Sequence, residues 1–309
     1  MQVRTVRTKP YKELHFRIGS YSLLGNSAGF HSSGAWWKSK LLKTENEDKM
    51  YFLIQSNIYS DPDHGRIYDA LDELNYSYET IIVTKETKKI GLKTNRKNVF
   101  VYGSVTLARL ALKCTDWYPG SFYSNNHLFE TYSKQYKENV LNYDFEVVKL
   151  NDKIDWDNNE ELFIKPLRNA KVFTGKVFDK YEWEEFKHEA LACRRSEYFN
   201  EKTLVQISKP QVVFKEARLW IVGRQIVDAG YYRFNANTLF EQNVAKEGIE
   251  LAKQMISVFN VAEAFVMDIG LTSNGWKIIE VNCINSSGFY PNTNVKSIFK
   301  ALNLYLSKG

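Results

Sequence analysis

Between residues 50 and 155, short apolar runs alternate with amphipathic segments, and this order limits the possible folds more than any other feature. The runs at 51–54, 78–83 and 99–102 have the composition of buried strands, whereas 65–74 carries its apolar residues at helical spacing. Strands that alternate with helices form βαβ units and a parallel sheet. We therefore predict a small open α/β domain over residues 50–155.

The second half of the chain has a different pattern. After an acidic, loop-like segment at 151–160, strands follow one another with few helices between them. The expected strands are 162–165, 203–207, 212–222, 225–234, 264–271 and 276–282, and the expected helices are 179–193, 243–259 and one from 294 onward. Strands grouped in this way indicate an antiparallel α+β arrangement, so we predict a second domain over residues 156–309.

Residues 1–49 show the periodicity of neither a helix nor a strand. They hold nine Lys and Arg against four Asp and Glu, a balance of +5, while the whole chain has a formal charge of +6. Residues 50–309 are therefore close to neutral, at +1, and nucleic-acid binding is not the expected function. We expect residues 1–49 to form a flexible extension; a leader similar to a transit peptide and a translation start at Met50 are the alternatives.

Cysteine usage and the length of apolar runs restrict the compartment. Cys114, Cys193 and Cys283 lie far apart and show no C-x-x-C pair, so neither a disulfide framework nor a cysteine zinc site is expected. No run approaches the ~18 apolar residues that a membrane-spanning helix needs. We therefore expect a cytoplasmic protein without a membrane partner.

The most informative segment is 264–282, in which an Asn-Gly pair indicates a hairpin turn. A two-residue loop at this pair would place Asp268 opposite Val281, whereas a three-residue loop over 273–275 would place Asp268 opposite Glu280. The second register gathers the apolar side chains on one face: Phe265, Met267, Ile269, Ile279 and Val281. Because the buried face determines the register of a strand, we predict the three-residue loop.

The opposite face of this hairpin then carries Asp268, Glu280 and Asn282 together. Two opposed carboxylates repel each other, and burial would raise the pKa of either one. A hard divalent cation removes that cost, and ligands that offer only oxygen suit Mg²⁺ that also contacts substrate phosphates. We predict a metal site here; the alternative is the solvated face of an ordinary amphipathic hairpin.

Two lysines lie at or just after the first strand of the second half. Lys165 ends the apolar run 162–165, and Lys171 follows six residues later in a loop. A lysine that leaves a buried strand can neutralise a nucleotide phosphate as a point charge. The alternative for each lysine is a side chain that extends to solvent.

Two arginines are expected on one face of the following strands. Alternation over 212–222 assigns Arg218 to one face, and a two-residue turn at 223–224 brings Arg233 to the same face. The residues that would share this face with Arg218 are Glu216, Trp220, Ala229, Tyr231 and Arg233. Two arginines there suit a polyanion or a developing acyl phosphate, and an exposed face with structural salt bridges is the alternative.

Taken in chain order, these segments resemble the ATP-grasp superfamily. The matching stretches are 163–166, 171–175, 204–208, 216–218, 267–269 and 279–282. The stretch 283–290 is most similar to the small ATP-grasp proteins of phages and bacteria. The resemblance covers about residues 50–300 and implies an α/β domain followed by an ATP-grasp domain with antiparallel sheets.

The resemblance also implies a role for each matching side chain. The implied nucleotide-binding residues are Lys165, Lys171, Gln206, Ile207, Ser208 and Arg218. The implied catalytic residues are Arg218, Arg233 and Lys171. The implied Mg²⁺ ligands are Asp268, Glu280 and Asn282. One departure from the family pattern lies in the hinge strand, where many members have an acidic residue that binds the nucleotide and this chain has Ser208 or Lys209.

The implied activity is an ATP- and Mg²⁺-dependent ligation of a carboxylate to an amine through an acyl phosphate. The partners would be ATP, a carboxylate and an amine, and the acceptor would be an amino acid, a peptide or a protein. A carboxylate needs this activation because it is otherwise a poor electrophile, and the protein mainly positions reactants and neutralises charge. The alternatives are a small-molecule kinase and a nucleotide-binding interaction protein without turnover.

Overall fold

The computed structural model describes residues 49–93, 95–156, 161–167, 173–192, 200–235 and 237–307. Contacts divide the chain into the units Met1–Asp48 and Lys49–Gly309, and the description below concerns the second unit. The predicted flexible extension lies outside the described residues, apart from Lys49. No helix in the described ranges is long and apolar enough to cross a membrane.

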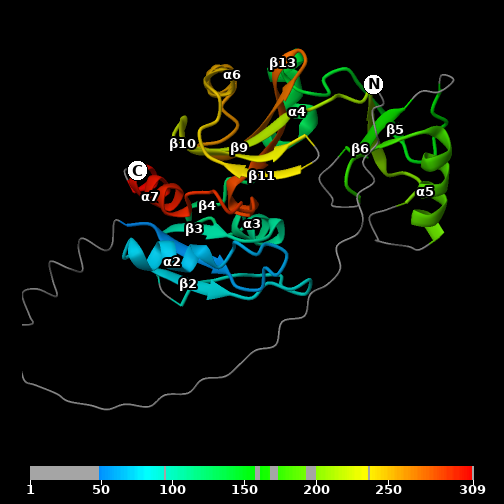
Figure 1. The fold of residues 1–309 in the computed structure, drawn as a ribbon. Coiled ribbons are helices and arrows are strands. Elements are labelled where there is room, and N and C mark those ends of the chain that lie inside the picture. The colour runs from blue at the N-terminus through cyan, green and yellow to red at the C-terminus, as the bar shows by residue number, and fades with distance from the viewer. Residues whose placement is uncertain are drawn as a thin grey trace, which may run out of the picture. The chain divides into compact units, whose positions relative to one another are not determined.

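The first sheet, sheet A, is parallel, as the alternation of strands and helices predicts (Figure 1). Its strands in spatial order are β2 (Tyr78–Ile81), β1 (Tyr51–Gln55), β3 (Asn98–Tyr102) and β4 (Tyr118–Gly120). Helix α2 (Arg66–Glu73) shares a core with Phe52 and Tyr102 on one face. Helix α3 (Val105–Ala111) shares another core with Leu53 and Val101 on the other face. Side chains of a strand alternate between the two faces, so both faces of this sheet are covered.

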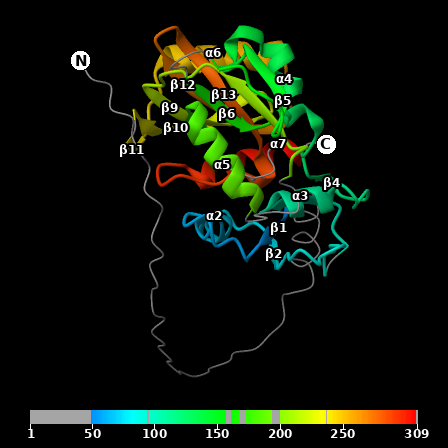
Figure 2. The same ribbon diagram turned by 90° about the vertical axis from the view of Figure 1, so that its right-hand side faces the viewer.

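Sheet B is antiparallel and has the strand order β11-β10-β9-β12-β13. The bounds are β9 Lys215–Val222, β10 Gln225–Phe234, β11 Asn237–Glu241, β12 Ala264–Thr272 and β13 Gly275–Cys283. One face packs against α6 (Lys246–Val258) and α4 (Phe129–Tyr136), with Leu219, Met267 and Met255 in the shared core (Figure 2). The edge strand β11 is a short element that the sequence analysis does not predict.

Sheet C has the strand order β5-β8-β6-β7 and is antiparallel. The bounds are β5 Phe145–Lys149, β6 Leu162–Pro166, β7 Lys176–Phe178 and β8 Leu204–Ser208. Helix α5 (Lys180–Ala192) covers one face, where Trp183 packs among Ile164, Val205 and Ile207. Strand β5 therefore belongs with β8 rather than with the parallel strands that precede it.

The last helix, α7 (Val295–Leu306), joins sheet A to sheet B. Its residues Ile298 and Phe299 share one core with Phe52 of β1 and with Trp220 and Val266 of sheet B. This packing leaves sheet A continuous with the antiparallel half through a common interior. The division of the chain into domains at residue 155 remains a proposal.

The hairpin of β12 and β13 pairs Asp268 with Glu280, which confirms the predicted register at these two residues. The predicted three-residue loop is wrong, because Thr272 pairs with Gly275 and two residues remain between them. Gly275 closes the turn with a φ of +88°, a left-handed conformation that only glycine adopts without a steric penalty.

A β-bulge in β13 explains how a shorter loop gives the same pairing at the acidic residues. Asp268 pairs with Glu280 but the next residue, Ile269, pairs with Ile278, so Ile279 is the extra residue. Ile278 is fully buried in the core of sheet B, whereas Ile279 is only partly buried. The prediction that Ile279 lies on the core face is therefore wrong.

A second set of irregularities lies between β9 and β10. Gln225 pairs with Val222, which confirms the two-residue turn, but the register shifts between Ile226 and Asp228. The shift places Ala229 and Tyr231 against the sheet B core instead of on the face of Arg218, so that prediction is wrong for both residues. A further shift beyond Tyr231 returns Arg233 to the side of Glu216.

Candidate functional site

The three predicted metal ligands meet on one side of sheet B. The Asn282 amide nitrogen Nδ2 donates to Glu280 Oε1 at 2.7 Å. Arg218 Nη2 lies 2.7 Å from Asp268 Oδ2 and 3.9 Å from Glu280 Oε1, so it stands between the two carboxylates. Trp220 and Val266 precede Arg218 and Asp268 on this face and are buried in the core shared with sheet A, which encloses one end of the polar group.

Arg218 of β9 and Asp268 of β12 form a bidentate ion pair across neighbouring strands. Arg218 donates from Nε to Asp268 Oδ1 at 2.8 Å and from Nη2 to Asp268 Oδ2 at 2.7 Å. Burial alone would lower the pKa of Arg218, but the adjacent Asp268 carboxylate raises it above its usual value. The guanidinium is therefore a permanent positive charge fixed in the plane of Asp268.

Two further contacts fix the far side of the Arg218 guanidinium. Its Nη1 donates to the backbone oxygen of Gly288 at 2.8 Å, and its Cζ lies 4.8 Å from the centre of the Tyr290 ring. Tyr290 in turn stacks on Tyr232 with ring centres 4.6 Å apart. Arg218 thus uses three of its five N–H groups within the protein, which leaves two for a ligand.

Glu280 has the electrostatic signature of a carboxylate that lacks a counter-charge. Burial raises the pKa of Glu280, the nearby Asp268 carboxylate raises it further, and the hydrogen bond from Asn282 opposes the rise. The side chain is nevertheless 45% exposed, so it faces an open space within a crowded wall. A divalent cation would stabilise the ionised form of Glu280.

The donor set fits a cation held mainly from β13. Glu280 and Asn282 line the cavity described below, and the Asn282 amide nitrogen is already used, which leaves its oxygen as a ligand. Asp268 is 1% exposed and both its oxygens accept from Arg218, so it would bind a cation only through its remaining lone pairs. Within the described ranges no group of three or more His, Cys, Asp and Glu suits a metal, and the remaining ligands would have to be phosphate oxygens or water.

A cavity of about 490 Å³ separates sheet C from the acidic strand. Its walls come from β6, from the segment before β7, from β13 and from the segment that leads into α4. The lining residues are His127, Leu128, Phe129, Tyr132, Lys165, Pro166, Leu167, Phe173, Thr174, Gly175, Glu280, Val281 and Asn282. A lysine from one sheet and a carboxylate from another therefore face the same space.

Lys165 reaches this space from the end of β6. Its Nζ lies 4.3 Å from the centre of the Phe129 ring. Burial lowers the pKa of Lys165 to about 8, and the charge of Glu280 opposes that shift. Gly175 allows the neighbouring segment to approach, since a Cβ at this position would lie 2.8 Å from both Lys165 Cβ and Phe163 Cζ.

The predicted hinge strand β8 presents alternate residues to the cavity side and to the core. Gln206 pairs directly with Lys165 and so lies on the same face of sheet C. Gln206 Oε1 and Ser208 Oγ are buried and have no hydrogen-bond partner among the described residues. Ile207 packs in the core with Ile164, so only its backbone could contact a nucleotide.

Of the other two predicted site residues, the structure describes one. Arg233 is 52% exposed and forms an ion pair with Glu216 at 3.0 Å, on the Arg218 side of sheet B. Lys171 lies outside the described residues.

Several residues of the cavity wall carry no signal in the sequence. His127, Phe129 and Tyr132 belong to a stretch predicted only as a helix, yet they line the cavity next to Lys165 and Glu280. Burial lowers the pKa of His127 to about 4, so its ring is neutral at pH 7. These contacts arise between elements distant in sequence, and no spacing rule along the chain could reveal them.

Two antiparallel sheets that enclose a cavity, with a lysine on one and the Asp…Glu-x-Asn set on the other, define the ATP-grasp class. A family model for an ATP-grasp domain, the third family of its clade, matches residues 122–302, and the chain belongs to this family. No curated protein sequence matches the chain at a significant level.

Solved structures of ATP-grasp proteins share the fold at low sequence identity. D-alanine–D-alanine ligase from Bacillus anthracis has a TM-score of 0.60 and 12% identity, over 84% of this chain and 97% of that one. A RimK domain ATP-grasp protein from Sphaerobacter thermophilus has a TM-score of 0.56 and 9% identity, over 82% and 99%. The ATP-grasp ligase PsnB with its minimal precursor has a TM-score of 0.51 and 12% identity, over 82% and 98%. At these identities the likeness concerns the fold alone.

Proposed function

We propose that the protein is an ATP- and Mg²⁺-dependent ligase that joins a carboxylate to an amine through an acyl phosphate. One observation carries this proposal: Lys165 from sheet C and the Glu280–Asn282 pair from sheet B line a single cavity. A positive wall opposite an oxygen-donor wall suits a polyphosphate that carries a cation. Membership of the ATP-grasp family and the fold shared with known ligases support the same reaction class.

The proposed role of each residue follows from its position. Lys165 would neutralise phosphate oxygens, together with Lys171. Gln206 and Ser208 have buried polar atoms without partners among the described residues, which supports a contact with the polar edge of the adenine. Glu280 and Asn282 would hold the cation, whose bound charge would offset negative charge on the phosphates.

Arg218 is the proposed catalytic residue for the transfer step. Its two remaining N–H groups would donate to the phosphoryl group as charge develops there. Arg233 is exposed beside Glu216 and would contact the phosphate or the carboxylate substrate. Asp268 keeps Arg218 charged and oriented in this scheme and would contribute to the cation site only secondarily.

The reaction balances without a protein nucleophile. A carboxylate oxygen would attack the γ-phosphorus and the bond to the ADP oxygen would break, which gives an acyl phosphate and ADP. The amine nitrogen would then attack the acyl carbon, phosphate would leave, and the amine would lose a proton to give the amide. The protein contributes orientation and charge stabilisation.

The substrate class is proposed more broadly than the reaction. An amino acid, a peptide or a protein could supply either reacting group. The structure of PsnB was determined with a precursor peptide, and we propose a peptide or protein acceptor first. Partly exposed aromatic side chains beside the site, among them Phe214, Phe234 and Phe240, would suit such a chain. A cytoplasmic location remains a prediction from the cysteine pattern.

The test is ADP release from ATP with panels of carboxylates and amines, each alone and in combination. The ligase proposal predicts ADP and phosphate release that requires both substrates together. Rapid ADP release with a carboxylate alone, and accumulation of a stable phosphorylated product, would favour the kinase alternative. Glu280→Ala should abolish the turnover of an active pair, and unchanged turnover in that variant would refute the cation site.

A further inference from the structure

The loop after the acidic strand is placed directly against the proposed catalytic arginine. We call residues 288–294 the strap. The strap contributes the Gly288 oxygen that accepts from Arg218 Nη1 and the Tyr290 ring that faces the Arg218 guanidinium. The strap therefore sets the orientation of the part of Arg218 that Asp268 does not hold.

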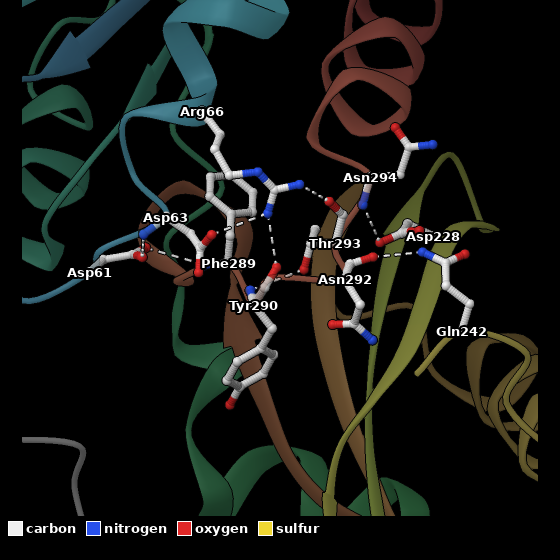
Figure 3. A network of polar contacts seen from close by, with 10 residues as sticks. All are labelled: Asp61, Asp63, Arg66, Asp228, Gln242, Phe289, Tyr290, Asn292, Thr293 and Asn294. Carbon is white, nitrogen blue, oxygen red and sulfur yellow. Dashed lines mark hydrogen bonds and ion pairs between the residues drawn. The ribbon is translucent and has the colours of Figure 1, made fainter. Parts of the chain in front are cut away.

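The N-terminal half of the protein holds one side of the strap (Figure 3). Arg66, the first residue of α2, donates from Nη1 to the Tyr290 oxygen at 3.0 Å and from Nη2 to the Thr293 oxygen at 2.6 Å. Asp61 Oδ2 accepts from the backbone nitrogen of Phe289 at 3.2 Å. Asp63 orients Arg66 through an ion pair at 3.3 Å.

Sheet B holds the other side of the strap. The Asn292 amide nitrogen donates to the backbone oxygens of Tyr231 at 2.9 Å and Glu241 at 2.7 Å. Asp228 Oδ2 accepts from the backbone nitrogen of Asn294 at 3.1 Å (Figure 3). Because both sides are fixed by hydrogen bonds, the strap has a defined position only while the contacts from α2 persist.

The aromatic packing beneath the strap adds a second link to the N-terminal half. Phe289 stacks between Tyr102 of sheet A, with ring centres 5.2 Å apart, and Trp220 of sheet B, at 5.0 Å. The Tyr102 hydroxyl also donates to the backbone oxygen of Ser287. The residues just before Tyr290 are thus held by sheet A as well as by sheet B.

We propose that Arg66 and Asp61 are positioning residues for Arg218, which they control through the strap. This inference rests on the proposed function for its effect on turnover, but not for its structural content. Both residues lie outside the stretch 122–302 that the ATP-grasp family model matches. The ATP-grasp region of this chain is therefore completed by two side chains from the preceding α/β region.

The geometry explains why Arg66 in particular is needed. A planar guanidinium can bond two backbone oxygens three residues apart at the same time, whereas an ammonium acts as a point charge. Small misplacements of a group that acts in a transfer step reduce its rate strongly, since about 1 Å can cost about a hundredfold. We expect that loss of Arg66 shifts the strap by a fraction of that distance.

The first experiment compares Arg66→Met and Arg66→Lys with the matched control Lys296→Met. Lys296 of α7 pairs with Glu73 of α2 at 2.7 Å, so it links the same two helices without contact to the strap. We expect kcat for ADP release to fall about tenfold in both Arg66 variants, with the KM for ATP unchanged, because Lys165 and Glu280 are not affected. Lys296→Met should behave as the wild type.

A second pair of variants tests Asp61. Asp61→Asn retains an oxygen that can accept from the Phe289 nitrogen and should remain close to wild type, whereas Asp61→Ala should resemble Arg66→Met. In an Arg218→Lys background, Arg66→Met should cause no further loss of kcat, because the two residues act on one step. Additive losses would overturn the proposal.

Hydrogen exchange of the strap backbone provides a readout that does not depend on activity. We expect faster exchange of peptides that cover 288–294 in Arg66→Met, with the rest of sheet B unchanged, and no such effect in Lys296→Met. Unchanged exchange in the strap would refute the positioning role even if the enzyme is an active ligase. Faster exchange together with an inactive wild type would refute the proposed function and leave the positioning role intact.

Discussion

The Lys165 ammonium lies against the Phe129 ring, where burial lowers its pKa to about 8 and Glu280 across the cavity opposes the shift. The group is therefore mostly charged at neutral pH and mostly neutral about one pH unit above its pKa. A charge with little water around it also interacts more strongly with a phosphate. The cavity thus has a phosphate-binding group that is effective at neutral pH and loses its charge in mildly alkaline solution.

ATP affinity should fall as the pH rises through about 8. Only the charged form of Lys165 attracts phosphate, and its pKa in the free protein is below the usual value, so the dissociation constant should rise by up to about tenfold per pH unit above that point. Titration calorimetry between neutral and alkaline pH would measure the change. Lys165→Arg stays charged and should flatten the dependence, and a wild-type affinity that does not vary with pH would contradict the assignment.

Gly175→Ala should weaken ATP binding and lower stability. The new Cβ would lie 2.8 Å from Lys165 Cβ and 2.8 Å from Phe163 Cζ, a distance that forces one of them to move. Overpacking of this kind costs about 1–3 kcal/mol, measurable by urea unfolding alongside the ATP dissociation constant. Gly91→Ala is the control, since no atom lies within 4 Å of a Cβ there. Equal effects of the two substitutions would argue against the close approach.

At the level of elements, alternation along the chain predicts the strands of sheet A, the long strands of sheet B and the pairing of Asp268 with Glu280. It does not predict the bulge at Ile279, because a strand with two adjacent isoleucines satisfies the buried face with either one. The same limitation applies to the shift between Ile226 and Asp228, which turns Tyr231 into the core. Bulges depend on cross-strand packing and not on local composition.

The bulge makes a specific prediction about two neighbouring side chains. Ile278→Ala should lower the free energy of unfolding by about 2–5 kcal/mol, because it opens a cavity in the sheet B core, where Ile278 is fully buried. Ile279→Ala should cost clearly less, because Ile279 is partly exposed. Urea denaturation of both variants would measure the difference, and the opposite order would support the unbulged register.

At the scale of the whole molecule, the site combines side chains from elements that are far apart in the sequence. The sequence suggests Lys165, Arg218 and the acidic hairpin because each lies in a recognisable strand, and the ATP-grasp resemblance brings them together. It offers no comparable signal for Phe129 or for Arg66, whose contacts depend on how the α4 segment and α2 pack against sheet B and the strap. Contacts between elements are the part of the site that only the three-dimensional structure provides.

The central claim is that two sheets bind ATP and its cation in one cavity. The most direct test is the ATP affinity of the wild type and of Glu280→Gln, measured by calorimetry with and without Mg²⁺. We predict that Mg²⁺ strengthens ATP binding to the wild type, and that Glu280→Gln loses this gain but keeps the Mg²⁺-free affinity, which depends on Lys165. If the variant binds ATP with Mg²⁺ as tightly as the wild type does, the proposed cation site is wrong.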